Sequence, residues 1–336
     1  MAPTGSAETL LAIRDLAVQY PADHGAVRAV AGVTLTVGAG ECVGIVGESG
    51  SGKTQLLLSI LGLSAPHARL RGSIRYRAQE LIGMRAASLN AIRGRRIGVI
   101  FQDPMTALNP YMRIGRQITE VARTHLGLGR RAADRRAIEM LVAVHISEPE
   151  RRLRQYPHEL SGGMRQRVMI AMALSCEPEL LLADEPTTAL DVTVQAQILS
   201  VLRELRARTG TAVVLVTHDL GVIAEMADRV AVMYAGRIVE QAPVDELFAR
   251  PRHPYTEALL RSIPRLDVPL PTRLASIGGT PPNPSSLPPG CPFAPRCIYR
   301  MDICEQATPP LTAVAPMHDK ACYHEGALGR LQAEVA

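Results

Sequence analysis

The 336-residue sequence has no tryptophan, only 3 % aromatic residues and no apolar run long enough to cross a bilayer. Its longest apolar stretch, Val168 to Cys176, falls well short of the roughly 18 residues of a transmembrane helix and is typical of a buried helix. Residues Met1 to Glu8 lack the charged and apolar regions of a secretion signal. We therefore expect a soluble, cytosolic chain, whose 47 % apolar content is ample for a buried core.

Lysine is also scarce, because the chain has 35 arginines but only two lysines, for a net charge of +5. A basic chain is compatible with an acidic partner such as a nucleic acid. However, neither an aromatic platform nor a zinc-finger spacing accompanies the eight arginines between Arg69 and Arg96. We therefore predict no nucleic-acid partner and attribute the arginines to compositional bias. Against that bias, Lys53 indicates a role that arginine cannot fill.

A glycine-rich segment surrounds this lysine. Residues 47–54 read Gly-Glu-Ser-Gly-Ser-Gly-Lys-Thr and match G-x-x-x-x-G-K-[ST], a loop that holds nucleotide phosphates and Mg²⁺. The apolar run Cys42–Val46 precedes it and the helix-like stretch Gln55–Leu63 follows, which is the strand–loop–helix context that such a loop needs. The predicted nucleotide-binding residues are Gly47, Glu48, Ser49, Gly50, Ser51, Gly52, Lys53 and Thr54.

Two later segments are informative as a pair. Residues 160–166 read Leu-Ser-Gly-Gly-Met-Arg-Gln, and residues 180–185 read Leu-Leu-Leu-Ala-Asp-Glu. Together they resemble the signature of ATP-binding-cassette (ABC) ATPases. The resemblance implies an α/β fold, a P-loop nucleotide-binding domain with a mixed sheet core, an antiparallel β subdomain and an α-helical subdomain. It also implies that a second cassette's ATP contacts the signature residues Ser161, Gly162, Gly163 and Gln166, and that Asp191 belongs to the dimer loop.

The same resemblance assigns roles around the γ-phosphate of ATP. Asp184 would hold Mg²⁺ together with Thr54 and Gln102. Glu185 would polarise the attacking water and His218 would help to hold it, which makes these two residues the predicted catalytic pair.

Periodicity gives an outline of the secondary structure. Alternating polarity predicts antiparallel strands over residues 10–20 and 29–37, and helical spacing predicts an all-helical insertion between residues 112 and 156. Tyr20, at the end of the first strand, stands where the family places an aromatic ring on adenine, and an ordinary strand-end tyrosine is the alternative. Further strands are predicted at 42–46, 72–77, 97–101, 180–183 and 212–216, and further helices at 165–175 and 192–208.

Composition divides the chain into three parts. We predict an ABC ATP-binding domain over residues 1–263, with its helical subdomain at about 107–160. Eight prolines between Pro264 and Pro289 predict an extended linker over residues 264–290. Residues 291–336 form a predicted cysteine-rich C-terminal module.

Two further stretches resemble the ATP-binding subunits of oligopeptide and dipeptide permeases. Residues 100–110 read Ile-Phe-Gln-Asp-Pro-Met-Thr-Ala-Leu-Asn-Pro, and residues 252–256 read Arg-His-Pro-Tyr-Thr. The resemblance implies an ATP hydrolase, peripheral on the cytoplasmic face of the membrane, that powers the import of di- or oligopeptides. The implied partners are a second, homologous ATPase subunit, two transmembrane permease subunits and, indirectly, a solute-binding protein.

Other classes of ABC protein are weighed against this one. Import of nickel or another small solute remains open, as does a redox-sensing soluble ABC ATPase. An ABC ATPase of DNA repair would need a long coiled coil between Gly52 and Ser161, and one of translation would need a second cassette; the sequence has neither.

Six cysteines fall into two groups. Cys42 and Cys176 lie in apolar segments and are interpreted as packing residues. The four in the C-terminal module are interpreted as metal ligands, since disulfides are disfavoured in the cytosol. Their wide spacing lacks a zinc knuckle and suits a [4Fe–4S] cluster, which the permease resemblance also implies; zinc and a metal-free tail are the alternatives. The predicted cluster ligands are Cys291, Cys297, Cys304 and Cys322.

Overall fold

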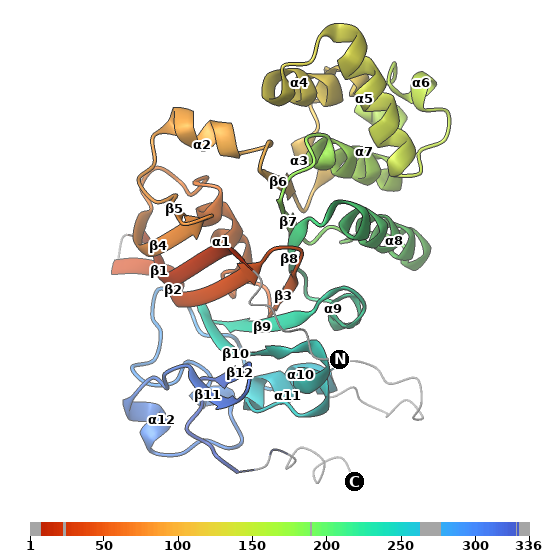
Figure 1. The fold of residues 1–336 in the computed structure, drawn as a ribbon. Helices are drawn as coiled ribbons and strands as arrows, with labels where there is room; N and C mark the ends of the chain where they lie inside the picture. Colours follow the sequence, from red (N-terminus) through yellow and green to blue (C-terminus); the bar gives the residue numbers. More distant parts are fainter. Residues whose placement is uncertain (1–7, 23–24, 189, 263–276, 327, 329–336) are drawn as a thin grey trace. The chain divides into compact units, whose positions relative to one another are not determined.

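The computed structural model describes residues 8–22, 25–188, 190–262, 277–326 and 328 (Figure 1). The chain forms two compact units whose segments alternate along the sequence. One unit contains residues 1–11, 36–42 and 75–216, and the other contains residues 12–35, 43–74 and 217–336. The domain boundaries predicted at 263 and 290 stay predictions. Residues 264–276 of the predicted linker lie outside the described residues.

A four-stranded sheet begins the chain, with the strand order β2-β1-β4-β5. In β1, apolar side chains on alternate positions are fully buried, among them Leu11 and Ile13, as a sheet with one face on the core requires. This confirms the two N-terminal strands that alternation predicted. The strands are β1 (Thr9–Ala22), β2 (Gly25–Gly38), β4 (Arg69–Tyr76) and β5 (Gln79–Glu80).

The unit that contains residues 75–216 has a parallel sheet. Leu180 of β7 pairs with Ile97 of β6 on one side and with Ala212 of β8 on the other. All five residues of β7 and of β8 are buried, which explains why β8 is apolar throughout and β7 is apolar up to its last residue, Asp184. The strands are β6 (Ile97–Ile100), β7 (Leu180–Asp184) and β8 (Ala212–Val216).

This unit also contains helices. The insertion that helical spacing predicted over residues 112–156 is present and consists of two longer helices, α4 and α5, and the short α6, with α4 and α5 packed against α7. The longest apolar run lies in α7 and is buried, as expected. The helices are α2 (Ala86–Ile92), α3 (Pro104–Ala107), α4 (Ile114–Leu126), α5 (Arg130–Ala143), α6 (Pro149–Arg152), α7 (Gly162–Leu174) and α8 (Val192–Thr209), with a 3-10 turn, η1 (Pro157–Glu159).

The other unit combines parallel and antiparallel pairing. Strand β3 pairs with β9 in parallel, and β10 pairs with β9 antiparallel. The C-terminal segment continues this sheet, because β12 pairs with β10 and β11 with β12. The cysteine-bearing segment is therefore joined to the cassette strand β10 through β12. The strands are β3 (Cys42–Val46), β9 (Arg229–Tyr234), β10 (Arg237–Pro243), β11 (Thr312–Ala315) and β12 (His318–Lys320).

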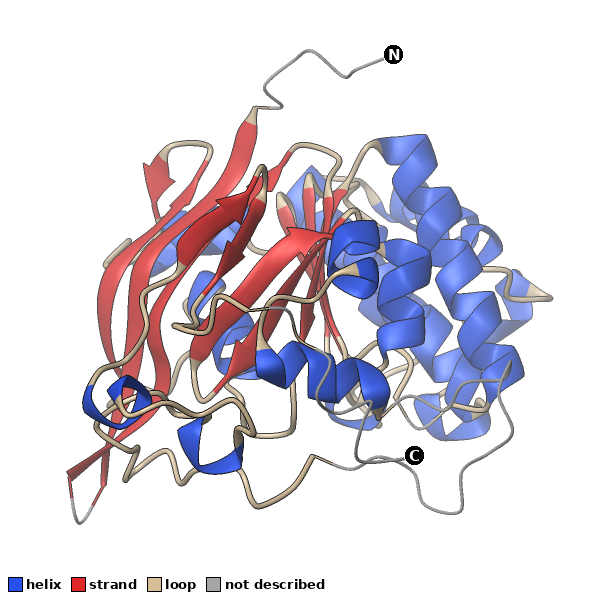
Figure 2. Cartoon of the chain, turned by 90° about the horizontal axis from the view of Figure 1, so that it is seen from below, coloured by secondary structure: helices blue, strands red, loops and turns tan. Residues whose placement is uncertain are grey.

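The remaining helices belong to the same unit. They are α1 (Lys53–Ile60), α9 (Leu220–Met226), α10 (Val244–Ala249), α11 (Pro254–Arg261) and α12 (Ile303–Gln306), with a second 3-10 turn, η2 (Ala294–Arg296). The chain thus has the expected α/β character, with strands and helices both abundant (Figure 2). No helix in the described part of the chain is long and apolar enough to span a membrane.

Candidate functional site

The predicted phosphate loop connects β3 to α1. Gly47 has φ +155°, and a Cβ added there would lie 2.2 Å from the carbonyl oxygen of Met233. Gly52 has φ +101°, and a Cβ there would lie 2.2 Å from the carbonyl oxygen of Ala29. Both positions therefore require glycine for its conformation and for its lack of a side chain. The loop therefore packs directly against neighbouring backbone, and any larger residue at Gly47 or Gly52 would clash with it.

Lys53 is the first residue of α1 and is buried within this loop. Its ammonium donates hydrogen bonds to the carbonyl oxygens of Gly47 at 2.7 Å and Glu48 at 3.0 Å. The charged group thus lies across the inside of the loop, beside the backbone that the motif uses for phosphates. Thr54, the next residue, is exposed and leaves its hydroxyl accessible to a ligand.

Tyr20 lies at the end of β1 and contacts the helix that follows the loop. Its hydroxyl donates a hydrogen bond to Gln55, and its ring meets the His67 ring edge-on at a centroid distance of 5.7 Å. The residue is half-buried. The ring and the hydroxyl of Tyr20 thus both have partners in this chain, and the predicted contact with adenine stays a prediction.

The predicted acidic half of the site lies in the other unit, at the end of β7. Asp184 is the last residue of the strand and is buried. Glu185 follows with φ +46°, an unusual conformation for a residue with a side chain. Its carboxylate accepts hydrogen bonds from the Gln102 amide at 3.0 Å and the Thr188 hydroxyl at 2.7 Å. Strained backbone is concentrated at functional sites, which agrees with the role predicted for Glu185.

His218 lies between β8 and α9 and is exposed. The turn around it is fixed by its neighbours: the Asp219 amide donates to the Thr217 hydroxyl, and the Asp219 carboxylate caps α9. His218 belongs to the unit that carries the phosphate loop, whereas Glu185 and Gln102 belong to the other unit. The structure therefore brings Gln102 to Glu185, and the predicted pairing of His218 with Glu185 stays a prediction.

The predicted signature residues open α7. The Ser161 hydroxyl caps the helix by accepting the Met164 N–H at 3.3 Å. Ser161, Gly162 and Gly163 line a cavity of about 450 Å³ together with Asp191, which caps α8 in the same way. The N-terminus of a helix carries free N–H groups and a partial positive charge, which suit an anion.

Gln166 lies one turn further into α7. It is 1 % exposed, and its amide donates a hydrogen bond to the carbonyl oxygen of Pro186. It thus links the signature helix to the segment that carries Asp184 and Glu185. The hydrogen bond to Pro186 is a reason, within this chain, for a glutamine at this position of the signature.

The four C-terminal cysteines line one small, mostly apolar cavity, which His253 and His324 share. The Nε2 atom of His324 is buried with no hydrogen-bond partner in the described structure. Burial, together with the neighbouring thiols, raises the pKa of Cys297 to about 12. The four cysteines that share the cavity are Cys291, Cys297, Cys304 and Cys322.

No metal site is formed by these side chains as they stand. Among the described residues, no three histidine, cysteine or acidic side chains are placed to hold one metal ion. The predicted [4Fe–4S] cluster and its zinc alternative are therefore not confirmed. The other two cysteines, Cys42 and Cys176, are buried among apolar residues, as predicted.

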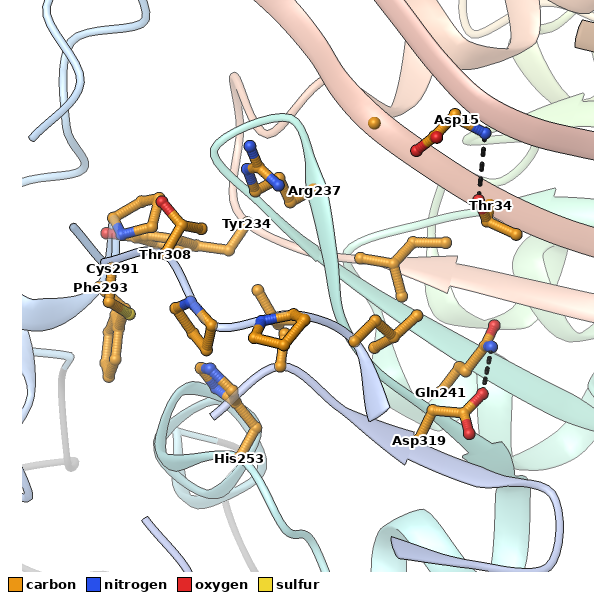
Figure 3. A pocket seen from close by; sticks show the side chains of 18 residues that line it. Asp15, Thr34, Tyr234, Arg237, Gln241, His253, Cys291, Phe293, Thr308 and Asp319 are labelled. Carbon is orange, nitrogen blue, oxygen red and sulfur yellow. Dashed lines mark hydrogen bonds between the residues drawn. The ribbon is translucent and has the colours of Figure 1, made fainter. Parts of the chain in front are cut away.

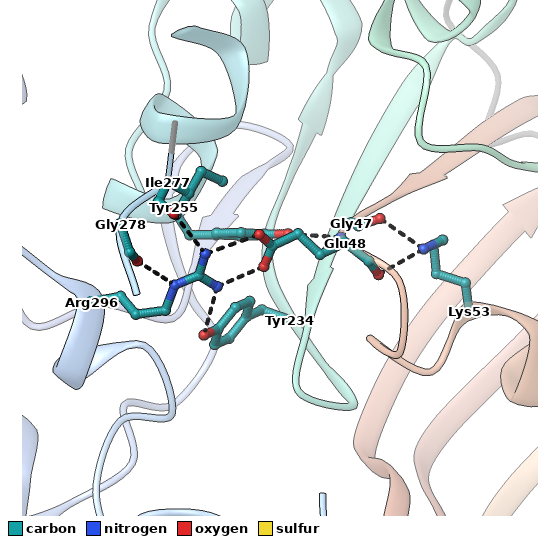
Figure 4. A network of polar contacts seen from close by, with 8 residues as sticks. All are labelled: Gly47, Glu48, Lys53, Tyr234, Tyr255, Ile277, Gly278 and Arg296. Carbon is teal, nitrogen blue, oxygen red and sulfur yellow. Dashed lines mark hydrogen bonds and ion pairs between the residues drawn. The ribbon is translucent and has the colours of Figure 1, made fainter. Parts of the chain in front are cut away.

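Sequence reasoning missed how the loop residue Glu48 is held. Its carboxylate pairs with Arg296, and its N–H donates to the Tyr255 hydroxyl at 2.9 Å (Figure 4). The available signals were an acidic residue inside a loop that binds phosphates and an arginine directly before Cys297. Neither signal identifies the other residue, because the two are far apart in the sequence.

A second cavity, of about 480 Å³, was also missed. It lies between β10 and the cysteine-bearing segment (Figure 3). Gln241 and Asp319 form a hydrogen bond of 2.6 Å on one side of it, and Cys291 and Phe293 stand on the other. Because its lining residues are distant from one another in the sequence, no local motif could predict it.

Comparison with known proteins places this geometry in a family. The family model for ABC transporters matches residues 30–188, and that for the C-terminal region of oligopeptide/dipeptide transporters matches residues 239–304. The chain is 50 % identical to the oligopeptide transport ATP-binding protein OppD of Salmonella typhimurium, over 94 % of each chain. It is 51 % identical to the protein of that name from Mycobacterium tuberculosis, over 97 % of this chain and 54 % of the relative. It therefore spans about half the length of that relative.

A solved structure gives the same result for the fold. The ATP-binding cassette MJ0796, in a dimeric post-hydrolysis state bound to ADP and Pi, matches 70 % of this chain and 98 % of its own, with a TM-score of 0.64 and 29 % identity. The P-loop ABC ATPase fold is thus confirmed. With half of its residues identical to relatives of the same length, the chain belongs to the oligopeptide and dipeptide transport family of ABC ATP-binding proteins.

Proposed function

We propose that this protein is the ATP-binding and ATP-hydrolysing subunit of an ABC importer for di- or oligopeptides. One observation carries the proposal: the identity of 50 % to an oligopeptide transport ATP-binding protein extends over nearly the full length of both chains. The phosphate loop and the strained Glu185, each described above, supply chemistry that such a subunit needs. Import of nickel or another small solute is the alternative cargo.

Nucleotide binding is assigned to the loop between β3 and α1. The Lys53 ammonium now donates to two loop carbonyls, and the β- and γ-phosphates of ATP would exchange for those contacts. The exposed hydroxyl of Thr54 is available for Mg²⁺, and Tyr20 is assigned to the adenine. Loop N–H groups between residues 47 and 54 supply the remaining phosphate contacts.

Hydrolysis is assigned to the residues at the end of β7 and to His218. Mg²⁺ neutralises phosphate charge when it is bound, and the oxygen donors Asp184, Thr54 and Gln102 suit its preference for hard ligands. The Glu185 carboxylate takes a proton as water attacks the γ-phosphorus, and the bond to the β–γ bridging oxygen breaks. His218 is assigned to hold the water. The hydrogen bonds from Gln102 and Thr188 fix the Glu185 carboxylate before ATP arrives.

The signature helix is assigned to the nucleotide of a second chain. Ser161, Gly162 and Gly163 form a helix terminus with a cavity of about 450 Å³ beside it, and the chain's own phosphate loop lies in the other unit. We propose a heterodimer with a homologous ATPase subunit. The isolated chain is then expected to hydrolyse ATP slowly and to be activated by its paired subunit; rapid turnover by a demonstrated monomer would contradict a two-chain site.

The assembly is proposed to include two transmembrane permease subunits and to receive cargo from a solute-binding protein. This chain would then lie on the cytoplasmic face of the membrane. The test is reconstitution of the complex in vesicles with internal ATP and external labelled peptide. Peptide uptake that requires ATP supports the proposal, and uptake of Ni²⁺ without uptake of any peptide would replace it with the alternative cargo.

We also propose that the four C-terminal cysteines bind a [4Fe–4S] cluster, with zinc as the alternative. Support comes from their shared cavity and from the thiolate chemistry that such clusters use. The cluster would supply the positive charge that buried thiolates need. Anaerobic purification should give brown protein that absorbs near about 400 nm with about four irons per chain. Colourless protein with stoichiometric zinc would decide for zinc.

A further inference from the structure

The phosphate loop is anchored from outside by the C-terminal segment. Glu48 is the second residue of the loop, and three different parts of the chain hold it. Lys53 donates to its carbonyl oxygen at 3.0 Å, and its own N–H donates to the Tyr255 hydroxyl at 2.9 Å. Its carboxylate forms a two-bond pair with Arg296, at 2.7 Å and 3.0 Å (Figure 4).

Arg296 is built into its surroundings and is not a mobile surface arginine. Its side chain is 3 % exposed, against 26 % for that of Glu48. Its Nε donates to the Gly278 carbonyl at 2.8 Å, and its terminal nitrogens also reach the Ile277 carbonyl and the Tyr234 hydroxyl. The guanidinium thus has partners on every side, and its position is fixed before Glu48 is considered.

An aromatic group supports this arginine. The rings of Tyr234, Tyr255 and Phe293 lie within 4.6–5.4 Å of one another, centroid to centroid. The Arg296 guanidinium carbon lies 5.8 Å from the Tyr234 ring centroid and 5.9 Å from that of Phe293. Stacked, buried and bidentate, this is the kind of site at which lysine does not substitute for arginine.

The segment that supplies Arg296 also carries the cysteines. Arg296 ends the 3-10 turn η2, and Cys297 is the next residue. Cys291 is tied to the same region because its N–H donates to the Cys304 carbonyl oxygen at 2.7 Å. The cysteine-bearing segment is therefore linked directly to Glu48 through the Arg296 side chain.

We propose that Arg296 is a positioning residue of the phosphate loop, through which the cysteine-bearing segment sets the affinity of this chain for ATP. Its guanidinium holds the Glu48 carboxylate, and the Glu48 backbone is part of the loop on which the Lys53 ammonium rests. Without that hold, the loop must be ordered by ATP itself, which lowers affinity. The inference rests on the proposed nucleotide site at residues 47–54.

The test is a double-mutant cycle in the full chain. Arg296→Gln, Glu48→Gln and the double variant are titrated with Mg²⁺ and a fluorescent ATP analogue, and their thermal unfolding is recorded. Each single change is expected to weaken binding about tenfold, and the double variant about tenfold as well, because both remove the same interaction. Arg296→Lys is expected to recover only part of the affinity. The matched control is Arg300→Gln, since Arg300 lies in the same segment but pairs with Glu305 at 3.5 Å on the exposed surface.

A second readout separates positioning from general destabilisation. Amide hydrogen exchange is expected to rise in Arg296→Gln for the peptide that spans residues 47–54, with little change in β7 and β8. Binding by Arg296→Gln within about twofold of wild type would overturn the proposal, as would losses that add in the double variant. If Arg296→Gln does not fold, the same comparison with Arg296→Lys decides. If the wild-type protein bound no ATP, or if Lys53→Ala bound it as well as wild type, the proposed nucleotide site itself would be refuted.

Discussion

Lys53 is one of only two lysines in a chain of 336 residues, and its ammonium is buried inside the phosphate loop. A compact ammonium fits between two loop carbonyls and phosphate, whereas a planar guanidinium does not. Lys53→Arg is therefore expected to weaken ATP binding at least about 100-fold, measured by titration with a fluorescent analogue. The reverse exchange at an exposed site, Arg250→Lys, whose side chain is 64 % exposed, is the control and should leave affinity unchanged. Near-normal binding by Lys53→Arg would contradict the role assigned to this residue.

Glu179, just before β7, is expected to give a pH-dependent contribution to stability. Burial alone would raise the pKa of its carboxyl, but hydrogen bonds from Tyr76 and Arg77 and the charge of Arg96 outweigh burial and lower it. A carboxyl whose pKa is lowered by folding stabilises the protein above its unfolded pKa, and this stabilisation is lost as the pH falls through the folded pKa. Glu179→Gln should therefore cost roughly 1 kcal/mol at pH 7 and progressively less below about pH 4.5. Urea unfolding at pH 7 and pH 3 measures this, and a difference that does not depend on pH would refute it.

Individual site residues differ in how far the sequence could predict them. Gly47 to Thr54 form a contiguous motif, because a loop that wraps phosphates must supply its contacts from neighbouring residues. The role of Glu185 was predicted from the resemblance of residues 180–185 to the ABC ATPases, because an acidic residue after an apolar strand is not specific by itself. Arg296 could not be predicted, since its partner Glu48 is brought to it only by the tertiary fold. The position of Gln166 inside the molecule likewise follows from its contact with Pro186 and not from the signature itself.

At the scale of elements, the packing of β6 against α7 depends on a glycine. A Cβ added at Gly98 would lie 2.6 Å from the Ala173 carbonyl oxygen and 3.0 Å from Pro178. The added methyl group would force the backbone at Ala173 to shift, which is energetically costly. Gly98→Ala should therefore destabilise the protein by about 2 kcal/mol, measured as a lower urea midpoint. Gly278→Ala is the control, because a Cβ there meets nothing within 4 Å. Equal midpoints for the two variants would show that α7 is not packed as described.

Element prediction succeeded where one local signal dominated. Strands β3 and β8 have the predicted bounds, because a short apolar run that is buried throughout has clear ends. Helix α1 begins at Lys53, two residues before its predicted start, since the loop motif itself supplies the first turn. The pairing of β12 with β10 was not predicted, because it joins Lys320 to Glu240 across a long separation and neither short strand has a strong pattern. The cysteine-bearing segment is in this respect less separate than its composition indicated.

At the scale of the whole molecule, the residues assigned to catalysis are distributed over both compact units. The phosphate loop and His218 belong to one unit, and Glu185 and the signature helix belong to the other. Turnover is thus expected to depend on both units of this chain and on a second chain, whereas nucleotide affinity depends chiefly on the unit with the phosphate loop. A substitution at Glu185 should consequently separate binding from hydrolysis.

That separation is the most direct test of the role assigned to Glu185. In the proposed complex with permease subunits, Glu185→Gln should bind ATP as wild type does, while hydrolysis per site falls about 100-fold or more. The matched control is Glu139→Gln, whose side chain is 61 % exposed and pairs only at 3.6 Å with Arg136; it should hydrolyse ATP normally. Retained ATP binding with lost turnover would support the role of Glu185 in hydrolysis, whereas hydrolysis by Glu185→Gln near the wild-type rate would refute it.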